Sequence, residues 1–194
     1  MSKTFILVRH GEAETNKQGI MSSDRDKYGL TEKGNKQIME TAEKLFDLFK
    51  KEINNISIYS SPVLRAKETA KIIANKFDLK IIIDNSFVEV GLGLNENRKI
   101  TDELKNKKYE ELLSLEKKFY SNKHPNGEKW SDILERMKKG FNDILKKDDN
   151  QIIIIVSHGD PLTILRNHLL KRNNCCLFNS EYYFKNGEFY IIEI

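Results

Sequence analysis

The most informative residues of this chain are 4–16, which read TFILVRHGEAETN. Phe5 to Val8 form a short apolar run, typical of a strand that is covered on both faces of a parallel sheet. The run stops at Arg9 and His10, and a strand that ends in such groups delivers them to the edge of an open α/β sheet, where ligands bind. Gly11 then permits a tight turn and the close approach of a ligand to the backbone.

The residue types at this strand end indicate phosphate chemistry at a histidine. Arginine offers a planar fork that binds two phosphate oxygens at once. Histidine is a nucleophile or a base near neutral pH. A simpler interpretation, in which Arg9 and His10 only terminate a strand, stays open at this point because short motifs often occur by chance.

Size and composition predict one α/β domain that spans residues 1–194. The net charge of +4 comes from lysines interspersed with glutamates, which argues against a nucleic-acid-binding protein and is compatible with a small anionic substrate. No segment reaches the length of a membrane span and the first residues lack a secretory signal, so no membrane contact is expected. Cys175 and Cys176 are adjacent and badly placed to bridge each other, which fits a reducing, cytoplasmic setting.

Apolar runs alternate with helical patterns along the chain, which predicts an α/β fold, a three-layer sandwich with a mostly parallel central sheet. The expected strands cover residues 5–8, 56–59, 81–83 and 152–156, and the expected helices cover 31–51, 62–77, 100–119, 128–145 and 161–170. Near the end, Asn186-Gly187 between residues 182–185 and 189–192 predicts a C-terminal antiparallel hairpin. Residues 91–99, rich in glycine and asparagine, are the expected loop.

Further polar groups follow the other predicted strands. SSP at 60–62 precedes RAKETA at 65–70, SHGD at 157–160 follows a strand and opens a helix, and Glu89 lies just beyond the third strand. The carboxyl ends of parallel strands meet at one edge of a sheet, and helix starts there favour anions. A second His-Gly at a strand end therefore strengthens the phosphate hypothesis.

These motifs together resemble the histidine phosphatase superfamily, in its phosphoglycerate-mutase-like branch. LVRHGE at 7–12, LTEKG at 30–34, the SSP and RAKETA segments and SHG at 157–159 occur in the family's order, from residue 4 to about 170. The resemblance implies that His10 becomes phosphohistidine and that Glu89 is the proton donor. It further implies that the phosphoryl group is held by Arg9, Asn16, Arg65, His158 and Gly159. PNGE at 125–128 and Arg136 resemble a further family segment.

Physical chemistry supports the same roles. Phosphoryl transfer needs an in-line nucleophile and positive charge around the phosphoryl oxygens, and two arginines and a histidine supply that charge without a metal or cofactor. His10 must be neutral to attack, so a hydrogen bond to its other ring nitrogen is expected. A carboxyl group with a raised pKa can protonate the leaving oxygen and later deprotonate water.

Other polar and aromatic residues have simpler interpretations. Glu128 is expected to help start a helix, and Asp160 to cap the helix that begins at Pro161. His124 and His168 are expected at the surface or in packing, because the four histidines lack the spacing of a zinc site. The residues expected in helix cores, rather than in a substrate pocket, are Phe119, Tyr120 and Trp130.

The compact segment between Glu89 and Gly127 resembles the short phosphatase-type members, since it lacks the inserted region and Trp-Arg-Arg stretch of the longer mutases. The sequence therefore predicts hydrolysis of a small phosphomonoester through a phosphohistidine, independent of metal. Two alternatives stay open: a cofactor-dependent phosphoglycerate mutase and a non-catalytic module that binds a phosphorylated ligand. The expected partner is a small phosphorylated metabolite, with homo-oligomer formation left open.

Overall fold

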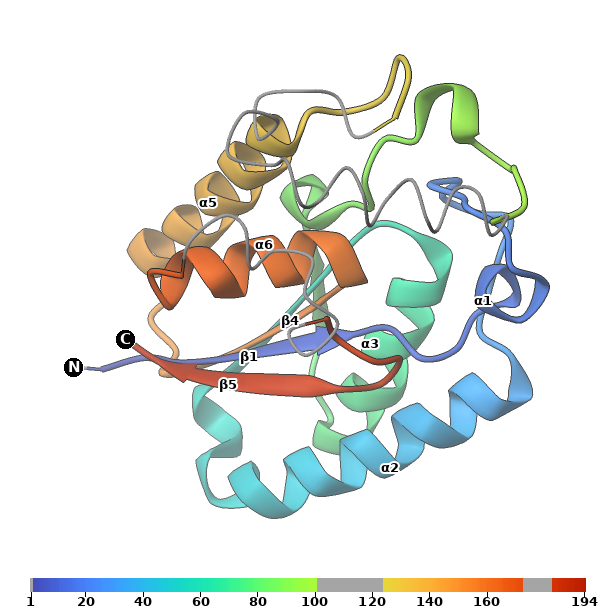
Figure 1. The fold of residues 1–194 in the computed structure, drawn as a ribbon. Coiled ribbons are helices and arrows are strands. Elements are labelled where there is room, and N and C mark those ends of the chain that lie inside the picture. The colour runs from blue at the N-terminus through green and yellow to red at the C-terminus, as the bar shows by residue number, and fades with distance from the viewer. Residues whose placement is uncertain (1, 101–123, 173–182) are drawn as a thin grey trace.

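A computed structural model describes residues 2–100, 124–172 and 183–194 of the chain. Its centre is a five-stranded sheet in the order β3-β2-β4-β1-β5 (Figure 1). All neighbours are parallel except β5, which runs antiparallel to β1. The strands are β1 (Thr4–Arg9), β2 (Ile56–Ser60), β3 (Ile81–Ile83), β4 (Ile152–Ser157) and β5 (Phe189–Glu193).

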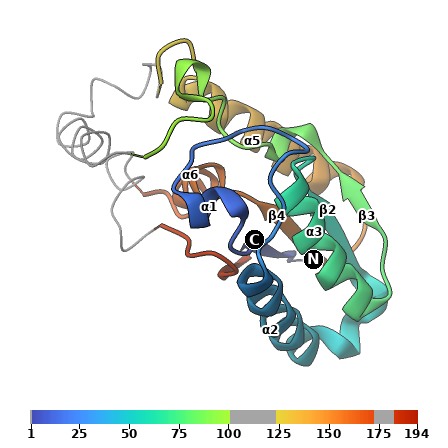
Figure 2. The same ribbon diagram turned by 90° about the vertical axis from the view of Figure 1, so that its right-hand side faces the viewer.

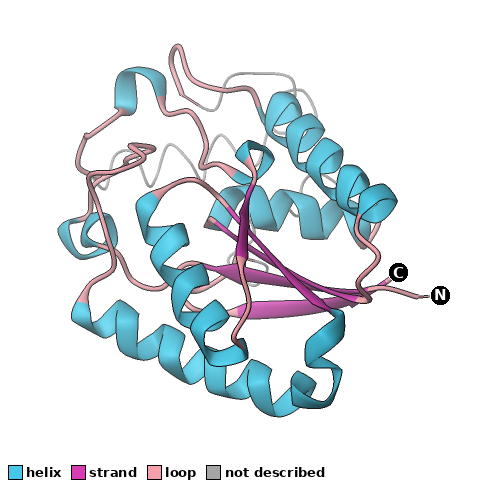
Figure 3. Ribbon diagram, turned by 180° about the vertical axis from the view of Figure 1, so that it is seen from behind, coloured by secondary structure: helices cyan, strands magenta, loops and turns pink. Residues whose placement is uncertain are grey.

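Helices cover both faces of this sheet, as the three-layer prediction required (Figures 2 and 3). On one face lie α2 (Glu32–Phe49) and α3 (Leu64–Phe77), and on the other lie α5 (Trp130–Lys147) and α6 (Gly159–Leu169). The short helix α1 (Glu14–Gln18) and the 3-10 turns Lys50–Asn55, Asn85–Phe87 and Gly93–Asn95 complete the described elements. The sandwich is therefore a helix–sheet–helix arrangement with the strands in its middle layer.

Side chains along β1 point alternately to the two faces of the sheet, which explains why its apolar run is unbroken. Phe5 and Leu7 pack into the cluster under α5 and α6, whereas Ile6 and Val8 pack under α2 and α3. A strand that is buried on both faces needs apolar residues at every position. The same expectation is wrong for β3, whose Ile82 and Ile83 are 45% and 49% exposed because β3 lies at the edge of the sheet.

The predicted C-terminal hairpin is correct in its antiparallel strand but wrong in its partner. Residues 183–185 are not a strand, and β5 pairs instead with β1. The turn at Asn186-Gly187 is present, with Gly187 in the left-handed region at φ +75°. The amide of Gly187 donates to the carbonyl of His10 at 3.1 Å, so this turn crosses the end of β1 rather than closing a hairpin.

Most of the remaining fold predictions are confirmed, and some fall on residues that the structure does not describe. Helices are found at four of the five predicted places. Residues 101–119 of the fifth predicted helix, 100–119, lie outside the described residues, as do Tyr120, Cys175 and Cys176. Trp130 belongs to the core, as expected. None of the described helices has the length and apolar character needed to cross a membrane. The two ends of the chain lie side by side, since Lys3 and Ile194 exchange backbone hydrogen bonds, and they lie opposite the carboxyl end of β1 (Figure 1).

Candidate active site

The ends of three strands bring the predicted site together. In the sheet register Arg9 stands beside Ser157, and Ser60 stands beside Val156. The next residue along each chain segment is His10, Ser61 or His158, and all three are at most 2% exposed. Parallel pairing of β1, β4 and β2 therefore places two histidines and a serine at one sheet edge, as expected for a ligand site in this architecture.

His10 is held as a single neutral tautomer. Its Nδ1 lies 2.7 Å from the carbonyl oxygen of Gly11, which can only accept, so Nδ1 carries the proton. Nε2 accepts a hydrogen bond from Nε of Arg65 at 3.1 Å. Burial, followed by the charges of Arg65, His158 and Arg9, holds the pKa of His10 well below its usual value. At neutral pH the ring therefore offers a lone pair at Nε2, as a nucleophile must.

Arg65 is buried in the first turn of α3 and reaches across the site. Its Nη2 donates to the carbonyl of Ser22 at 3.0 Å and lies 3.3 Å from Oε2 of Glu89. Burial lowers the pKa of Arg65, and the nearby Glu89 carboxylate opposes that shift. Neutral pH lies so far below the ordinary titration range of arginine that Arg65 stays charged. The motif residue Thr69 fixes this turn, since its Oγ1 donates to the carbonyl of Arg65 and accepts from the amide of Gly11.

His158 lies beside His10 but is hydrogen bonded to its supporting residue through Nε2 rather than Nδ1. Its Nε2 lies 2.8 Å from Oγ of Ser61, and its Nδ1 lies 3.5 Å from Oε2 of Glu89. The centroids of the two imidazole rings are 5.2 Å apart. Burial, followed by the charges of Arg65, Arg136 and Arg9, holds the pKa of His158 well below its usual value. The structure thus brings His10, Arg65, Glu89 and His158 into one cluster.

Arg9 lines the same edge and is held by the segment before β5. Its Nη1 donates to the carbonyl of Phe184 at 2.5 Å, and its guanidinium lies 5.1 Å from the ring centroid of Tyr183. Gly159 is needed for this packing, because a Cβ there would lie 2.4 Å from the hydroxyl oxygen of Tyr183. Gly159 therefore supports the wall of the site, in addition to any contact its amide makes with a ligand.

Arg136 and Glu128, which were not among the predicted site residues, hold the backbone around Glu89. Arg136 on α5 binds Glu128 through two hydrogen bonds, at 2.6 and 3.0 Å, and donates to the carbonyls of Ser86 at 2.8 Å and Glu89 at 3.4 Å. Glu128 in turn exchanges hydrogen bonds with Gly91. The expectation that Glu128 helps start the helix is wrong, because the N-cap is Lys129 without a side-chain cap. The signal was present in PNGE at 125–128 with Arg136 eight residues beyond Glu128.

Other predicted residues lie outside this cluster. Oδ1 of Asn16 accepts from the amide of Ala13 at 3.0 Å and from Nδ2 of Asn186 at 3.2 Å, on the exposed side of α1. Its predicted phosphate contact stays a prediction. Asp160 does not cap a helix at Pro161, since α6 already begins at Gly159 and its N-cap is His158.

The remaining histidines take up ordinary positions. Nδ1 of His124 lies 2.9 Å from Nδ2 of Asn95, next to the loop that follows Glu89. His168 lies in the last turn of α6. Neither belongs to the cluster around His10, which agrees with their expected packing or surface roles.

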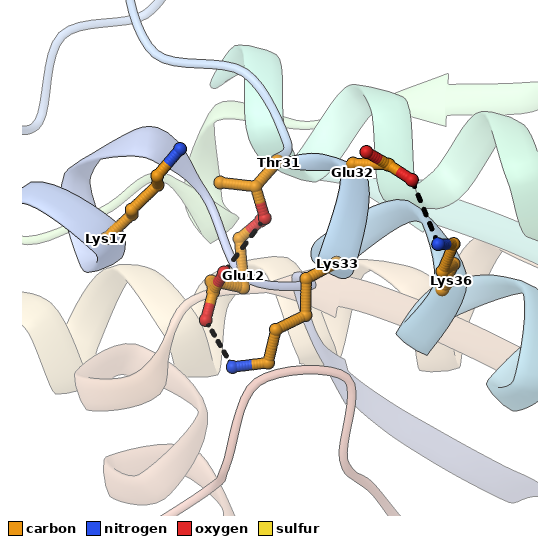
Figure 4. A pocket seen from close by; sticks show the side chains of 6 residues that line it. All are labelled: Glu12, Lys17, Thr31, Glu32, Lys33 and Lys36. Carbon is orange, nitrogen blue, oxygen red and sulfur yellow. Dashed lines mark hydrogen bonds and ion pairs between the residues drawn. The ribbon is translucent and has the colours of Figure 1, made fainter.

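A surface hollow of about 440 Å³ beside the first turn of α2 is a separate feature (Figure 4). Lys33 and Thr31 both bind Glu12 there, and Lys36 pairs with Glu32. The bond from Lys33 is the main cause of the lowered pKa of Glu12. Lys17 also lines the hollow, so its three lysines exceed its two carboxylates by one positive charge. The net attraction of the hollow for an anion is therefore weak.

The donor set could in principle hold a metal ion, because ligand atoms of His10, Glu89 and His158 lie within 4.8 Å of one another. Two features oppose a cation. Nε2 of His10 is already hydrogen bonded to a guanidinium, and both Arg9 and Arg65 lower the pKa of each histidine by their positive charge. The same charges attract a phosphoryl group.

Comparison with known proteins identifies the family. Residues 5–194 match the histidine phosphatase superfamily (branch 1). A 2,3-bisphosphoglycerate-dependent phosphoglycerate mutase of Thermoplasma acidophilum is 32% identical over 169 residues, which cover 87% of this chain and 77% of that protein. Phosphoserine phosphatase 1 of Hydrogenobacter thermophilus is 29% identical over 162 residues, which cover 81% and 72%.

Solved structures share the fold. Mycobacterial glucosyl-3-phosphoglycerate phosphatase superposes with a TM-score of 0.77 at 19% identity, over 100% of this chain and 91% of that one. α-Ribazole phosphatase of Shigella flexneri superposes with a TM-score of 0.75 at 22% identity, over 97% and 89%. The family match and the phosphatases among the relatives support a phosphomonoester hydrolase. Because the family match extends over nearly the whole chain, from residue 5 to residue 194, the chain belongs to the histidine phosphatase superfamily, branch 1.

Proposed function

We propose that this protein hydrolyses a small phosphomonoester through a phosphohistidine formed at Nε2 of His10. One observation carries the proposal. Around the His10 ring, Nη1 of Arg65, Nε of Arg9 and Nδ1 of His158 are buried and have no hydrogen-bond partner among the described residues. Buried donors without partners are costly, and a phosphoryl group offers anionic oxygens that can satisfy several of them at once.

The first half-reaction uses the geometry of the free site. When substrate enters, Nε of Arg65 exchanges its hydrogen bond with His10 for one with a phosphoryl oxygen, which frees the lone pair of Nε2. Nε2 then forms a bond to phosphorus while the bond from phosphorus to the ester oxygen breaks, and Glu89 in its acid form gives that oxygen a proton. Arg9, Arg65 and His158 stabilise the charge on the equatorial oxygens.

The second half-reaction returns the site to its starting state. The Glu89 carboxylate takes a proton from a water molecule as the water oxygen attacks phosphorus, and the Nε2–phosphorus bond breaks to release inorganic phosphate. The positive charge that a divalent ion supplies in other phosphoryl-transfer enzymes comes here from side chains, so the proposed reaction needs no metal.

Turnover of p-nitrophenyl phosphate in the presence of EDTA tests this proposal. The wild type should release p-nitrophenolate and phosphate in equal amounts, unaffected by EDTA, and His10→Ala should be inactive. Rapid acid-free quenching with a ³²P-labelled substrate should trap an acid-labile, alkali-stable label on wild type only. An inactive wild type with retained phosphate binding would overturn hydrolysis and favour a binding module, and activity that EDTA abolishes would overturn the metal-independent mechanism.

A mutase is the second candidate, and the 32% identity to the Thermoplasma acidophilum mutase is the observation that favours it. The two reactions differ in what accepts the phosphoryl group, water or a second phosphorylated hydroxy acid. Incubation with 3-phosphoglycerate, with and without 2,3-bisphosphoglycerate, separates them by the ratio of 2-phosphoglycerate to inorganic phosphate. A parallel phosphate-release screen over phosphoglycerates, sugar phosphates, phosphoserine and nucleotides defines the substrate class. The cytoplasmic location and a homo-oligomer stay predictions.

A further inference from the structure

The two active-site histidines are hydrogen bonded through opposite ring nitrogens. His10 uses Nδ1 to bind the carbonyl of Gly11, so Nε2 turns toward Arg65 and the site. His158 uses Nε2 to bind Ser61, so Nδ1 turns toward Glu89. The nitrogen that faces the reacting group therefore differs between the rings, and so can its protonation state.

The surroundings of Ser61 decide which atom carries the proton in its bond with His158. Ser61 is the fully buried second residue of the SSP segment, and its Oγ already accepts a hydrogen bond from the amide of Val63 at 3.3 Å. A serine hydroxyl has one proton to give. Among the described residues, Nε2 of His158, at 2.8 Å, is the acceptor within hydrogen-bond distance of that hydroxyl.

We propose that Ser61 is a positioning residue that donates to Nε2 of His158 and thereby keeps the neutral ring in its Nδ1–H tautomer, as a hydrogen-bond donor to the phosphoryl group. The proposal rests on the proposed phosphatase reaction. It assigns complementary tasks to the two imidazoles. His10 presents a lone pair to phosphorus, and His158 presents a proton to a phosphoryl oxygen, although neither ring is charged.

The charges that face His158 explain why a fixed tautomer matters. Arg65, Arg9 and Arg136 act on the ring from α3, β1 and α5, and the neutral ring of His10 lies beside it. Nδ1 of His158 lies 3.5 Å from Oε2 of Glu89, the carboxyl group that is the proposed proton donor. A ring in such surroundings stays neutral, and a neutral ring with its proton on Nε2 would turn a lone pair toward the anionic substrate and repel it.

Ser61→Ala tests the assignment, with Ser60→Ala as the matched control. Ser60, the preceding residue, is equally buried, but its hydroxyl donates to the carbonyl of Ser61 instead of bonding to His158. At pH 8, kcat/KM of Ser61→Ala for p-nitrophenyl phosphate should fall about 10-fold, less than the 10²–10³-fold loss typical of removing a transition-state donor outright. Ser60→Ala should retain the wild-type kcat/KM.

The pH profile separates tautomer control from a merely structural role. As pH falls, protonation of His158 places a proton on both ring nitrogens whatever Ser61 does, so the ratio of Ser61→Ala to wild-type kcat/KM should rise toward one. A ratio that stays constant with pH would overturn the proposal. A wild type without any turnover would instead contradict the proposed function itself.

A second readout does not depend on activity. Long-range ¹H–¹⁵N NMR spectra of ¹⁵N-histidine-labelled protein at pH 8 should show His158 with a protonated Nδ1 in wild type and in Ser60→Ala. In Ser61→Ala the Nδ1 resonance should move toward the unprotonated position. An unchanged tautomer in folded Ser61→Ala, or an Nε2–H tautomer in wild type, would overturn the assignment.

Discussion

Replacing either active-site histidine by glutamine should make folding less sensitive to acid. His10 and His158 are buried, and burial is the largest cause of their lowered pKa values. In the unfolded chain each imidazole titrates near pH 6.5. Below that pH the unfolded chain binds protons at these histidines and the folded protein does not, so the free energy of unfolding falls as pH falls. Above pH 6.5 this effect vanishes.

The size of the effect follows from proton linkage. A histidine that titrates at 6.5 when unfolded and stays neutral when folded costs about 1 kcal/mol of stability between pH 6.5 and 5.5, and about 1.4 kcal/mol for each further unit until the folded pKa is reached. Two such histidines cost the wild type about 2 kcal/mol over the first unit. His10→Gln or His158→Gln should recover about half of that loss.

Urea unfolding at pH 8.0, 6.5 and 5.5 measures the effect, because the change with pH is compared rather than the absolute stability of each variant. His168→Gln is the control. Its histidine is partly exposed in the last turn of α6 and its pKa is lowered less strongly, so the pH dependence should change little. Equal pH dependence in the wild type and both active-site variants would refute the argument that these rings are buried in neutral form.

Three further outcomes are expected. Glu89→Gln should slow single-turnover cleavage of an alkyl phosphate by about 10²–10⁴-fold and that of p-nitrophenyl phosphate far less, since nitrophenolate needs no proton to leave; equal losses would contradict the acid role. Arg136→Lys, which keeps the charge but loses the two-pronged bond, should lower kcat by about 10- to 100-fold while phosphate affinity measured by calorimetry is retained. Gly34→Ala should destabilise the fold by about 1–3 kcal/mol in urea unfolding, because its Cβ would lie 2.0 Å from the carbonyl oxygen of Glu12; wild-type stability would show that the α2 start can move away.

Elements whose local chemistry and tertiary surroundings agree could be predicted from the sequence. The apolar run before Arg9 has to be a central strand, because every one of its positions is buried on one face or the other. Elements whose local pattern is compatible with two tertiary arrangements could not be predicted. The Ile81–Ile83 run is as apolar as a central strand, yet it occupies the sheet edge. Asn186-Gly187 makes a turn in either case, and only the pairing of β5 with β1 shows which strands it joins.

The strand-end motifs, the layered fold and the family follow from the amino-acid sequence, because residue type and spacing specify which groups leave each strand and in what order. How those groups work together depends on contacts that form when the layers pack. Hydrogen bonds between residues far apart in the chain fix His10 through Arg65, His158 through Ser61, and the backbone of Glu89 through Arg136. Such partners come from different strands and helices, and packing of the layers is what brings them within 3.5 Å.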